Sequence, residues 1–176
     1  RFDECTWNGT AGEVKDSGEH ELNGTAMNGA TLTKGVINNA GKFDGNAYID
    51  IPQNNELSLT KDMSLSFWVN PTEQAYSVAN WQQNFIVKGF GTEFRVDFWY
   101  DGMEKCLCVA YTHGDNSQIV NPDNDKIYWD TWSHFTLVRD VRAKVIRFYI
   151  NGNLIDSKHY NTLGIGEPTP QLSGVT

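Results

Sequence analysis

The sequence predicts an all-β fold, an antiparallel β-sandwich, and three observations support this prediction. Apolar and polar residues alternate in several short segments, which is the period of a strand with one buried face. Turn-forming pairs of Gly, Asn, Asp and Pro separate these segments. No long stretch places apolar residues at helical spacing, so helix should be scarce. A chain of 176 residues suits one domain, expected over 1–176.

The first strands of the sandwich are expected at 47–51, 64–70 and 84–90. The segment AYIDI alternates and ends at Pro52. The segment SLSFWVN turns Leu, Phe and Val to one side and Ser, Trp and Asn to the other, and it ends at Pro71. The segment NFIVKGF runs to Gly89. Proline ends a strand because it has no N–H for the ladder.

The later strands are expected at 93–102, 106–114 and 133–140, followed by a hairpin over 147–157. In the first of these, Phe and Val share one face, whereas Glu, Arg, Asp and Trp share the other. In RFYINGNLIDS, Asn151-Gly152 interrupts two alternating runs. Asn-Gly favours a type I′ turn, because both central residues of that turn need φ > 0. The sequence therefore predicts a type I′ hairpin.

The first 42 residues differ from the rest because they are rich in Gly, Asn and Thr. Apolar anchors recur too regularly there for a disordered linker: Trp7, Val14, Leu22, Met27 and Leu32. We expect an ordered, looping segment that lays one strand on a sheet edge.

Charge excludes one class of partner. The formal net charge is −8, which repels a polyanion, so nucleic acid is not expected to bind. No apolar run approaches the roughly 20 residues of a membrane-spanning helix, so direct membrane insertion is not expected either. The chain opens RFDECTW, without Met or a signal peptide, and is interpreted as a mature or excised segment.

The three cysteines leave at least one thiol unpaired. Cys106 and Cys108 would share one face of a strand, a geometry that disfavours a disulfide between them, whereas Cys5 can pair with either. A C-x-C motif without a second ligand pair is a weak metal signal, so ordinary strand cysteines are the preferred interpretation.

Six segments follow one another in an order that resembles a known family: FDE, DSGEHELNGT, GKFDGNAYIDIP, LSLTKDMSLSFWVNP, WSHFTLVRD and IRFYINGNLIDS. Together they resemble the bacterial laminin-G-like modules of the concanavalin A-like jelly-roll superfamily. The opening FDECTWNGTAGEVKDSG further resembles modules of Gram-negative surface proteins associated with mannose-sensitive haemagglutinin pili. The resemblance implies a curved jelly roll, surface display or secretion, and glycan or protein binding through edge loops or the concave sheet.

The resemblance also implies a structural calcium ion. In many relatives backbone carbonyls near the chain start and the FDG turn hold it, and the matching residues here are Asp44 and Gly45, with Asp3 as a further ligand. An acidic side chain on the last strand completes the site in the family. This sequence stops at Thr176 before that residue, so we expect the last strand to be truncated or replaced by another segment.

Catalysis is not expected. The resemblance extends to enzymes that hydrolyse β-glucans with two carboxylates on one strand, and Glu93 and Asp97 share a face here. Arg95 lies between them and would keep both ionised, whereas a general acid needs a raised pKa. A structural ion-pair row is therefore the preferred interpretation, and His134 is expected to satisfy a hydrogen bond of the sheet.

Sugar binding needs aromatic rings that stack on a pyranose and polar groups that fix its hydroxyls. The expected ligand-binding residues supply both: Trp81, Trp99, Asp97, Arg95, Tyr76, Tyr111, His113 and Trp129. The outer face of one sheet is expected to gather Trp68, Arg95, Asp97, Trp99, Arg147 and Tyr149. The resemblance nevertheless gives Trp68 and Trp132 core positions, where they would pack.

Together these observations predict a non-catalytic carbohydrate-binding or adhesion module of an exported bacterial surface protein. Its partner would be a glycan or a cell-surface glycoconjugate, and the chain would belong to a larger multidomain protein at the cell surface or outside the cell. The alternative is a structural or protein-interaction module without a sugar site. A glycoside-active enzyme is the third hypothesis.

Overall fold

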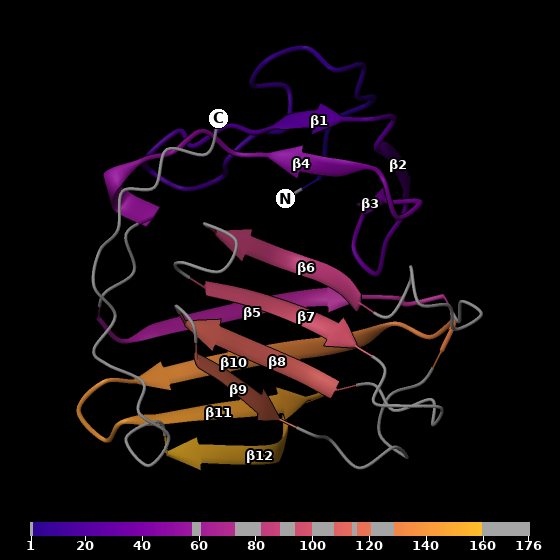
Figure 1. Cartoon of the computed structure of the whole chain (residues 1–176). Coiled ribbons are helices and arrows are strands. Elements are labelled where there is room, and N and C mark those ends of the chain that lie inside the picture. Colours follow the sequence, from indigo (N-terminus) through magenta and orange to yellow (C-terminus); the bar gives the residue numbers. More distant parts are fainter. Residues whose placement is uncertain are drawn as a thin grey trace. The chain divides into compact units, whose positions relative to one another are not determined.

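The computed structural model describes residues 2–57, 61–72, 82–88, 94–99, 108–113, 116–120 and 129–159, with the backbone alone for 82–83, 94–99, 108–113 and 116–120. The chain divides into two compact units (Figure 1). We call Arg1–Leu57 the N-terminal unit and Ser58–Thr176 the sandwich unit. The stretch expected to form one domain thus contains two units.

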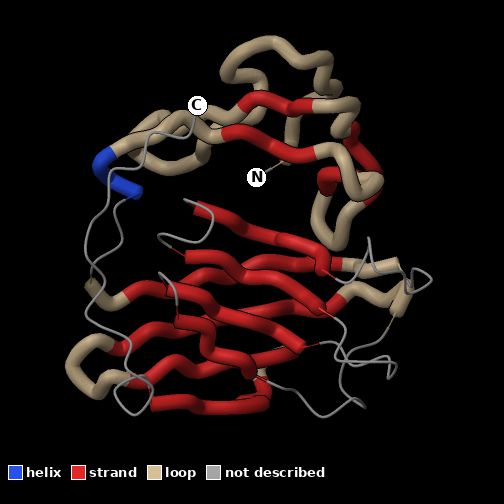
Figure 2. Tube along the Cα trace, in the orientation of Figure 1, coloured by secondary structure: helices blue, strands red, loops and turns tan. Residues whose placement is uncertain are grey.

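The N-terminal unit holds four short strands in two antiparallel pairs (Figure 2). The pairs are β1 (Thr25–Met27) with β4 (Tyr48–Asp50), and β2 (Thr31–Lys34) with β3 (Asn39–Lys42). A 3-10 turn, η1 (Asn55–Leu57), ends the unit. The expectation of one strand in the first 42 residues is wrong, because β1, β2 and β3 all lie there. Strands of three or four residues are too short to show alternation.

A small core of its own stabilises the N-terminal unit. Trp7, Val14, Ala26 and Ala30 are each at most 6% exposed. The ring of Phe2 meets Trp7 edge to face, with centroids 5.0 Å apart. Two of the expected anchors, Trp7 and Val14, therefore belong to the core. The other two members, Ala26 and Ala30, were not expected, because single small alanines form no recognisable apolar pattern in the sequence.

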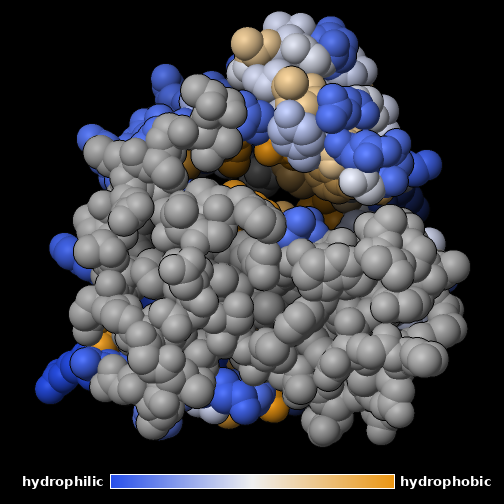
Figure 3. Space-filling view, in the orientation of Figure 1, coloured by the Kyte–Doolittle hydropathy of each residue, from blue (hydrophilic) through white to orange (hydrophobic). Residues whose placement is uncertain are grey.

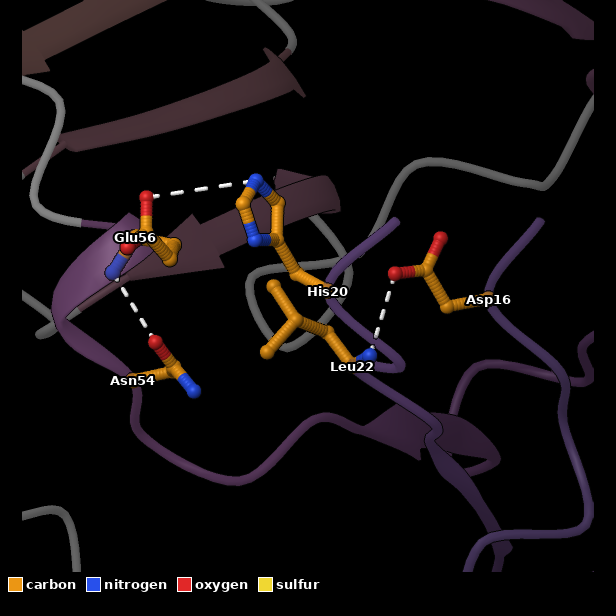
Figure 4. A network of polar contacts seen from close by, with 5 residues as sticks. All are labelled: Asp16, His20, Leu22, Asn54 and Glu56. Carbon is orange, nitrogen blue, oxygen red and sulfur yellow. Dashed lines mark hydrogen bonds and ion pairs between the residues drawn. The ribbon is translucent and has the colours of Figure 1, made fainter. Parts of the chain in front are cut away.

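Polar side chains shape the loops of this unit (Figure 4). Asp16 Oδ2 accepts a hydrogen bond from the Leu22 N–H at 3.0 Å. Asn54 Oδ1 accepts one from the Glu56 N–H at 2.9 Å, and Glu56 Oε2 lies 4.0 Å from Nε2 of His20. Such bonds satisfy backbone groups where no ladder does, which explains how a Gly- and Asn-rich segment is ordered.

Two four-stranded antiparallel sheets make up the described part of the sandwich unit. Sheet I has the order β12-β11-β10-β5, with β5 (Met63–Val69), β10 (Ser133–Asp140), β11 (Val145–Ile150) and β12 (Asn153–His159). Sheet II has the order β6-β7-β8-β9, with β6 (Gln82–Lys88), β7 (Phe94–Trp99), β8 (Cys108–His113) and β9 (Asn116–Val120). The chain therefore crosses from sheet I to sheet II after β5 and returns after β9.

The two sheets pack face to face, as Figure 1 shows for β6–β9 against β5 and β10–β12. The buried cluster comes from sheet I: Met63, Phe135, Leu137, Ile146, Phe148 and Ile150. From sheet II, Phe85 and Ile86 pack against it, and the rings of Phe67 and Phe85 lie 5.7 Å apart across the interface. The predicted antiparallel β-sandwich is confirmed.

The hairpin predicted at Asn151-Gly152 is also confirmed. Asn151 has φ 49° and Gly152 has φ 80°, as a type I′ turn requires. Ile150 pairs directly with Asn153, so the loop between β11 and β12 has only those two residues.

Helix is scarce, as predicted: η1 is the only one in the part of the chain that the structure describes. None of the described helical structure is long and apolar enough to span a membrane.

Candidate functional site

The best-defined candidate site lies on the outer face of sheet I. Trp68 is 47% exposed there, so the expected packing role of Trp68 is wrong. The reason is register: Trp68 lies opposite His134, whereas Phe67 lies opposite Phe135, which is buried. Successive residues of a strand point to opposite faces, so Trp68 faces away from the core.

Three side chains meet on this face. The rings of Trp68 and His134 lie 5.1 Å apart at an interplanar angle of 57°. Ser66 Oγ lies 2.8 Å from His134 Nε2, which confirms that His134 satisfies a hydrogen bond within the sheet. The His134 backbone N–H also donates to Asn151 Oδ1 at 2.9 Å, so the hairpin turn fixes the strand beneath the imidazole.

The face continues across β10 to β11. Thr136 lies opposite both Ser66 and Tyr149, so the half-buried Tyr149 shares the outer face. On β12, Leu154 lies opposite Tyr149 and is 54% exposed. We call Ser66, Trp68, His134 and Tyr149 the Trp68 face. It combines an exposed aromatic surface with hydroxyl and imidazole groups.

An ion pair borders the Trp68 face. Arg147 Nη1 lies 3.5 Å from Asp140 Oδ2. The Ala143 N–H donates to Asp140, and this bond, with the adjacent Arg147, holds the pKa of the carboxyl below its ordinary value. The carboxylate therefore stays ionised at neutral pH and Arg147 has a fixed partner.

The residues predicted on β7 lie in the other sheet. Arg95, Asp97 and Trp99 belong to sheet II, so the prediction that they share one outer face with Trp68, Arg147 and Tyr149 is wrong. The long crossovers of a sandwich separate strands that follow closely in sequence, which alternation alone does not reveal.

Backbone register nevertheless groups the three β7 residues. Arg95 lies opposite Val87 and Asp97 lies opposite Asn84, and both of these β6 residues are exposed. The intervening Ile86 packs against the core. By this register Arg95, Asp97 and Trp99 occupy the positions of the outer face of sheet II.

The remaining predicted ligand residues are dispersed. Tyr111 lies opposite Val96, and His113 opposite Phe94, so their register positions alternate with that of Asp97. Trp129 is half-buried and packs against the buried cluster of the sandwich. Two further residues, Tyr76 and Trp81, lie outside the described residues.

Of the three cysteines, Cys5 is an exposed free thiol, whereas Cys108 begins β8. Cys106 lies outside the described residues.

The expected calcium ligands lie in separate loops of the N-terminal unit. Asp44 Oδ1 accepts hydrogen bonds from the N–H groups of Asn46 and Ala47, both at 3.0 Å, and these bonds lower the pKa of Asp44. Gly45 has φ 97°, so it completes the turn. Asp3 instead accepts a bond from Asn38 Nδ2 at 3.1 Å.

Calcium takes six to eight oxygen ligands. The donor chemistry fits, since an ionised carboxylate and carbonyl oxygens are hard ligands. Among the described residues, however, no three His, Cys, Asp or Glu side chains gather as a metal cluster. A cation at the Asp44-Gly45 turn would therefore depend on main-chain oxygens.

The Ser66–His134 contact is the described arrangement nearest to a nucleophile–base pair. A catalytic pair also needs a group that orients the imidazole and donors for an oxyanion. In the described part of the chain no side chain is bonded to Nδ1 of His134. The contact holds the imidazole of His134 against the hydroxyl of Ser66.

Comparison with known protein families agrees with the β-sandwich fold. The family model described as the concanavalin A-like lectin/glucanases superfamily, of laminin-G type, matches residues 43–174. No curated protein and no solved structure matches the chain. The matched residues include both sheets of the sandwich and the Asp44-Gly45 turn.

Proposed function

Because the chain belongs to the concanavalin A-like lectin/glucanase superfamily, we propose that it is a non-catalytic carbohydrate-binding module. The observation that carries this proposal is the exposed indole of Trp68 beside His134 and Ser66. An indole can stack on the apolar face of a pyranose. The Ser66 hydroxyl keeps hydrogen-bonding capacity beyond its contact with His134, so it can meet a sugar hydroxyl.

The magnitudes correspond to a weak site. Stacking that buries ~80 Å² of apolar surface is worth about 2 kcal/mol at roughly 25 cal/mol per Å². The Trp68 side chain is already held beside His134, so binding orders few additional groups.

A second platform on sheet II is proposed from register. It would consist of Trp99, Asp97 and Arg95, with Trp81, which directly precedes β6 in the sequence, as a further stacking residue. Variants separate the two platforms, because they lie on different sheets.

A glycan array tests the function, followed by titration of any ligand found. Trp68→Ala should abolish most binding, while Tyr48→Ala, which removes another aromatic of 47% exposure, should leave it unchanged. If binding survives Trp68→Ala but is lost in Trp99→Ala and Trp81→Ala, the site lies on sheet II. Absence of any glycan ligand would contradict the proposal.

One observation favours the alternative of a protein-interaction module. The N-terminal unit exposes several large apolar side chains at 44–73%: Val36, Ile37, Phe43, Tyr48 and Ile51. Apolar residues among hydrophilic ones are visible on the upper part of Figure 3, where this unit lies. Exposed apolar surface is typical of protein contacts. Protein capture that Ile37→Ser abolishes, in a chain that binds no glycan, would establish this alternative.

We further propose an exported, surface-displayed adhesin as the setting, by analogy with pilus-associated surface modules, and a structural calcium ion at the Asp44-Gly45 turn. Surface labelling of intact cells tests the first proposal. Chelation, discussed below, tests the second.

A further inference from the structure

The sequence contains four Asn-Gly pairs, and all four lie within the described residues: Asn8-Gly9, Asn23-Gly24, Asn28-Gly29 and Asn151-Gly152. Asparagine is one of the thermolabile residues of proteins. Before glycine it can lose its side-chain amide, because glycine has no Cβ that keeps its backbone nitrogen away from the asparagine Cγ. That nitrogen must also give up its proton, so a hydrogen bond donated by the glycine N–H opposes the reaction.

The first pair is protected by a carboxylate. The Gly9 N–H donates to Glu13 Oε1 at 2.8 Å, and the Asn8 N–H donates to the other carboxylate oxygen at 2.7 Å. Such charge-assisted bonds are stronger than bonds between neutral groups. The negative charge also opposes loss of the glycine proton. Asn8 should therefore keep its amide.

The second pair is protected by packing. The Gly24 N–H donates to the Val14 carbonyl oxygen at 2.8 Å, within a bridge between these two residues. Gly24 is buried, and a Cβ built on it would lie 2.7 Å from Cγ2 of Ile49. Close packing leaves no room for the backbone rotation that brings the nitrogen to Cγ. Asn23 should keep its amide as well.

The other two pairs form exposed turns. Asn28 and Asn151 have φ of 52° and 49°, and the glycines that follow have φ of 84° and 80°, so each pair is the centre of a type I′ turn. The hydrogen bond of such a turn joins the residues on either side of the pair, as the Ala30 N–H donates to the Met27 carbonyl at 3.1 Å. It does not engage the glycine N–H. A Cβ on either glycine would meet no atom within 4 Å, so the backbone has room to rotate.

We propose that Asn28-Gly29 and Asn151-Gly152 are sites of self-catalysed deamidation. The glycine nitrogen forms a bond to Cγ of the asparagine. The side-chain nitrogen leaves as ammonia, taking up through solvent the proton that the glycine nitrogen releases. Water then opens the cyclic imide at one of its two carbonyls. The product is aspartate, or isoaspartate, in which the main chain runs through the former side chain.

At Asn151 the product changes the support of the Trp68 face. Asn151 Oδ1 accepts from the His134 N–H at 2.9 Å, and the Asn151 N–H donates to the His134 carbonyl at 2.8 Å. Isoaspartate lengthens the main chain of this two-residue loop by a methylene group, which a type I′ turn does not accommodate. The turn then no longer fixes the strand beneath His134. This matters for binding only if the proposed glycan function holds; the deamidation itself does not depend on that function.

Incubation of the folded whole chain at mildly alkaline pH tests the proposal without any glycan. Peptide mapping by mass spectrometry follows all four pairs in one sample. The two turn asparagines should lose ammonia at least about tenfold faster than Asn8 and Asn23, because the bonds of Gly9 and Gly24 must break before attack. In urea all four should react at similar rates, which separates the effect of the fold from that of the local sequence.

Glu13→Ala makes the test specific. It removes the acceptor of the Gly9 N–H, so Asn8 should react at a rate approaching that of the turn pairs, while Asn23 stays protected. Glu19→Ala, which removes an exposed carboxylate of another loop, should leave Asn8 protected. Circular dichroism melts confirm that both variants fold.

Equal rates at the four pairs of the folded chain would overturn the proposal. So would turn asparagines that stay intact in the folded chain although they react in urea. An Asn8 that remains protected in folded Glu13→Ala would contradict the role given to the glycine N–H.

Discussion

Gly152 is the residue whose substitution has the simplest physical consequence. Its φ is +80°, and a Cβ built on it would meet no atom within 4 Å. Gly152→Val therefore introduces backbone strain without a clash, and we expect it to destabilise the fold by about 1–2 kcal/mol. Urea denaturation measures the change.

Gly152→Asn is the matched control, because asparagine tolerates the left-handed region better than a β-branched residue does. It should lose clearly less stability than Gly152→Val. Equal stability of the wild type and Gly152→Val would contradict the turn geometry.

At the same scale, Trp68 and Trp129 show what a sequence can and cannot assign. Alternation along SLSFWVN places Trp68 with serines on the outward side, and that pattern agrees with its 47% exposure. Only the resemblance to the family, which gives Trp68 a core position, predicted that this side chain points inward. For Trp129 no alternation was available, since it precedes β10, and its packing against the cluster depends on tertiary structure.

At the scale of the element, the loop around Asp16 links stability to pH. Its two carboxylate oxygens accept from the Gly18 N–H at 2.7 Å and the Leu22 N–H at 3.0 Å. These bonds lower the pKa of Asp16 from its ordinary 3.8. A depressed folded-state pKa contributes stability above the unfolded value, and that contribution disappears as pH falls through the folded pKa.

Asp16→Asn keeps one oxygen acceptor and loses the charge, so it should melt below the wild type at neutral pH. The difference should shrink as pH falls below about 4, where Asp16 first becomes protonated in the unfolded chain, and it should vanish at the lower pH where the folded carboxyl is protonated too. Melting curves at several pH values check this, with Asp50→Asn as an exposed control on β4. A difference that stays constant across pH would show that charge plays no part.

The Asp44 turn is the element that tests calcium. An ion bound only by the native state stabilises it by RT ln(1 + [L]/Kd), about 2.7 kcal/mol at a hundredfold excess over Kd. A chelator should therefore lower the melting temperature of the wild type, and added calcium should restore it. Identical melts under both conditions would remove calcium from the account.

Asp44→Asn provides the control for that experiment. Its amide oxygen can still accept from Asn46 and Ala47, while the charge that favours a cation is absent. The melt of this variant should respond to the chelator less than the wild-type melt does.

Strand prediction succeeded where alternation was long. The segment 133–140 matches β10, and the hairpin over 147–157 matches β11 and β12. Strand β9 was not predicted, because NSQIV has only two apolar residues and no alternation. The sequence predicts one strand in the first 42 residues, where the structure has β1, β2 and β3. These strands also lack alternation, because side-chain bonds, rather than a periodic apolar face, order that segment.

At the scale of the whole molecule, the sandwich could be predicted but the composition of its faces could not. Alternation states which residues share a side of their own strand. It does not state which strands share a sheet, and the crossovers after β5 and β9 decide that. For this reason Trp68 and Trp99, expected on one surface, belong to two.

The proposed stacking platform predicts how tightly the whole molecule binds. A single stacking platform with a few hydrogen bonds corresponds to about −4 kcal/mol, a dissociation constant near millimolar. Titration with a monosaccharide should therefore give weak binding. Many copies displayed on one surface should bind a glycan-coated surface about 10²–10⁴-fold more tightly, because later contacts form at high effective concentration.

The measurement compares soluble chain with chain immobilised on beads, both against the glycan identified on the array. Trp68→Ala beads provide the control, since they keep the valency and lose the platform. Micromolar binding by a monosaccharide would contradict a single exposed platform and indicate an enclosed site. Equal retention of wild-type and Trp68→Ala beads would show that adhesion uses another surface of the chain.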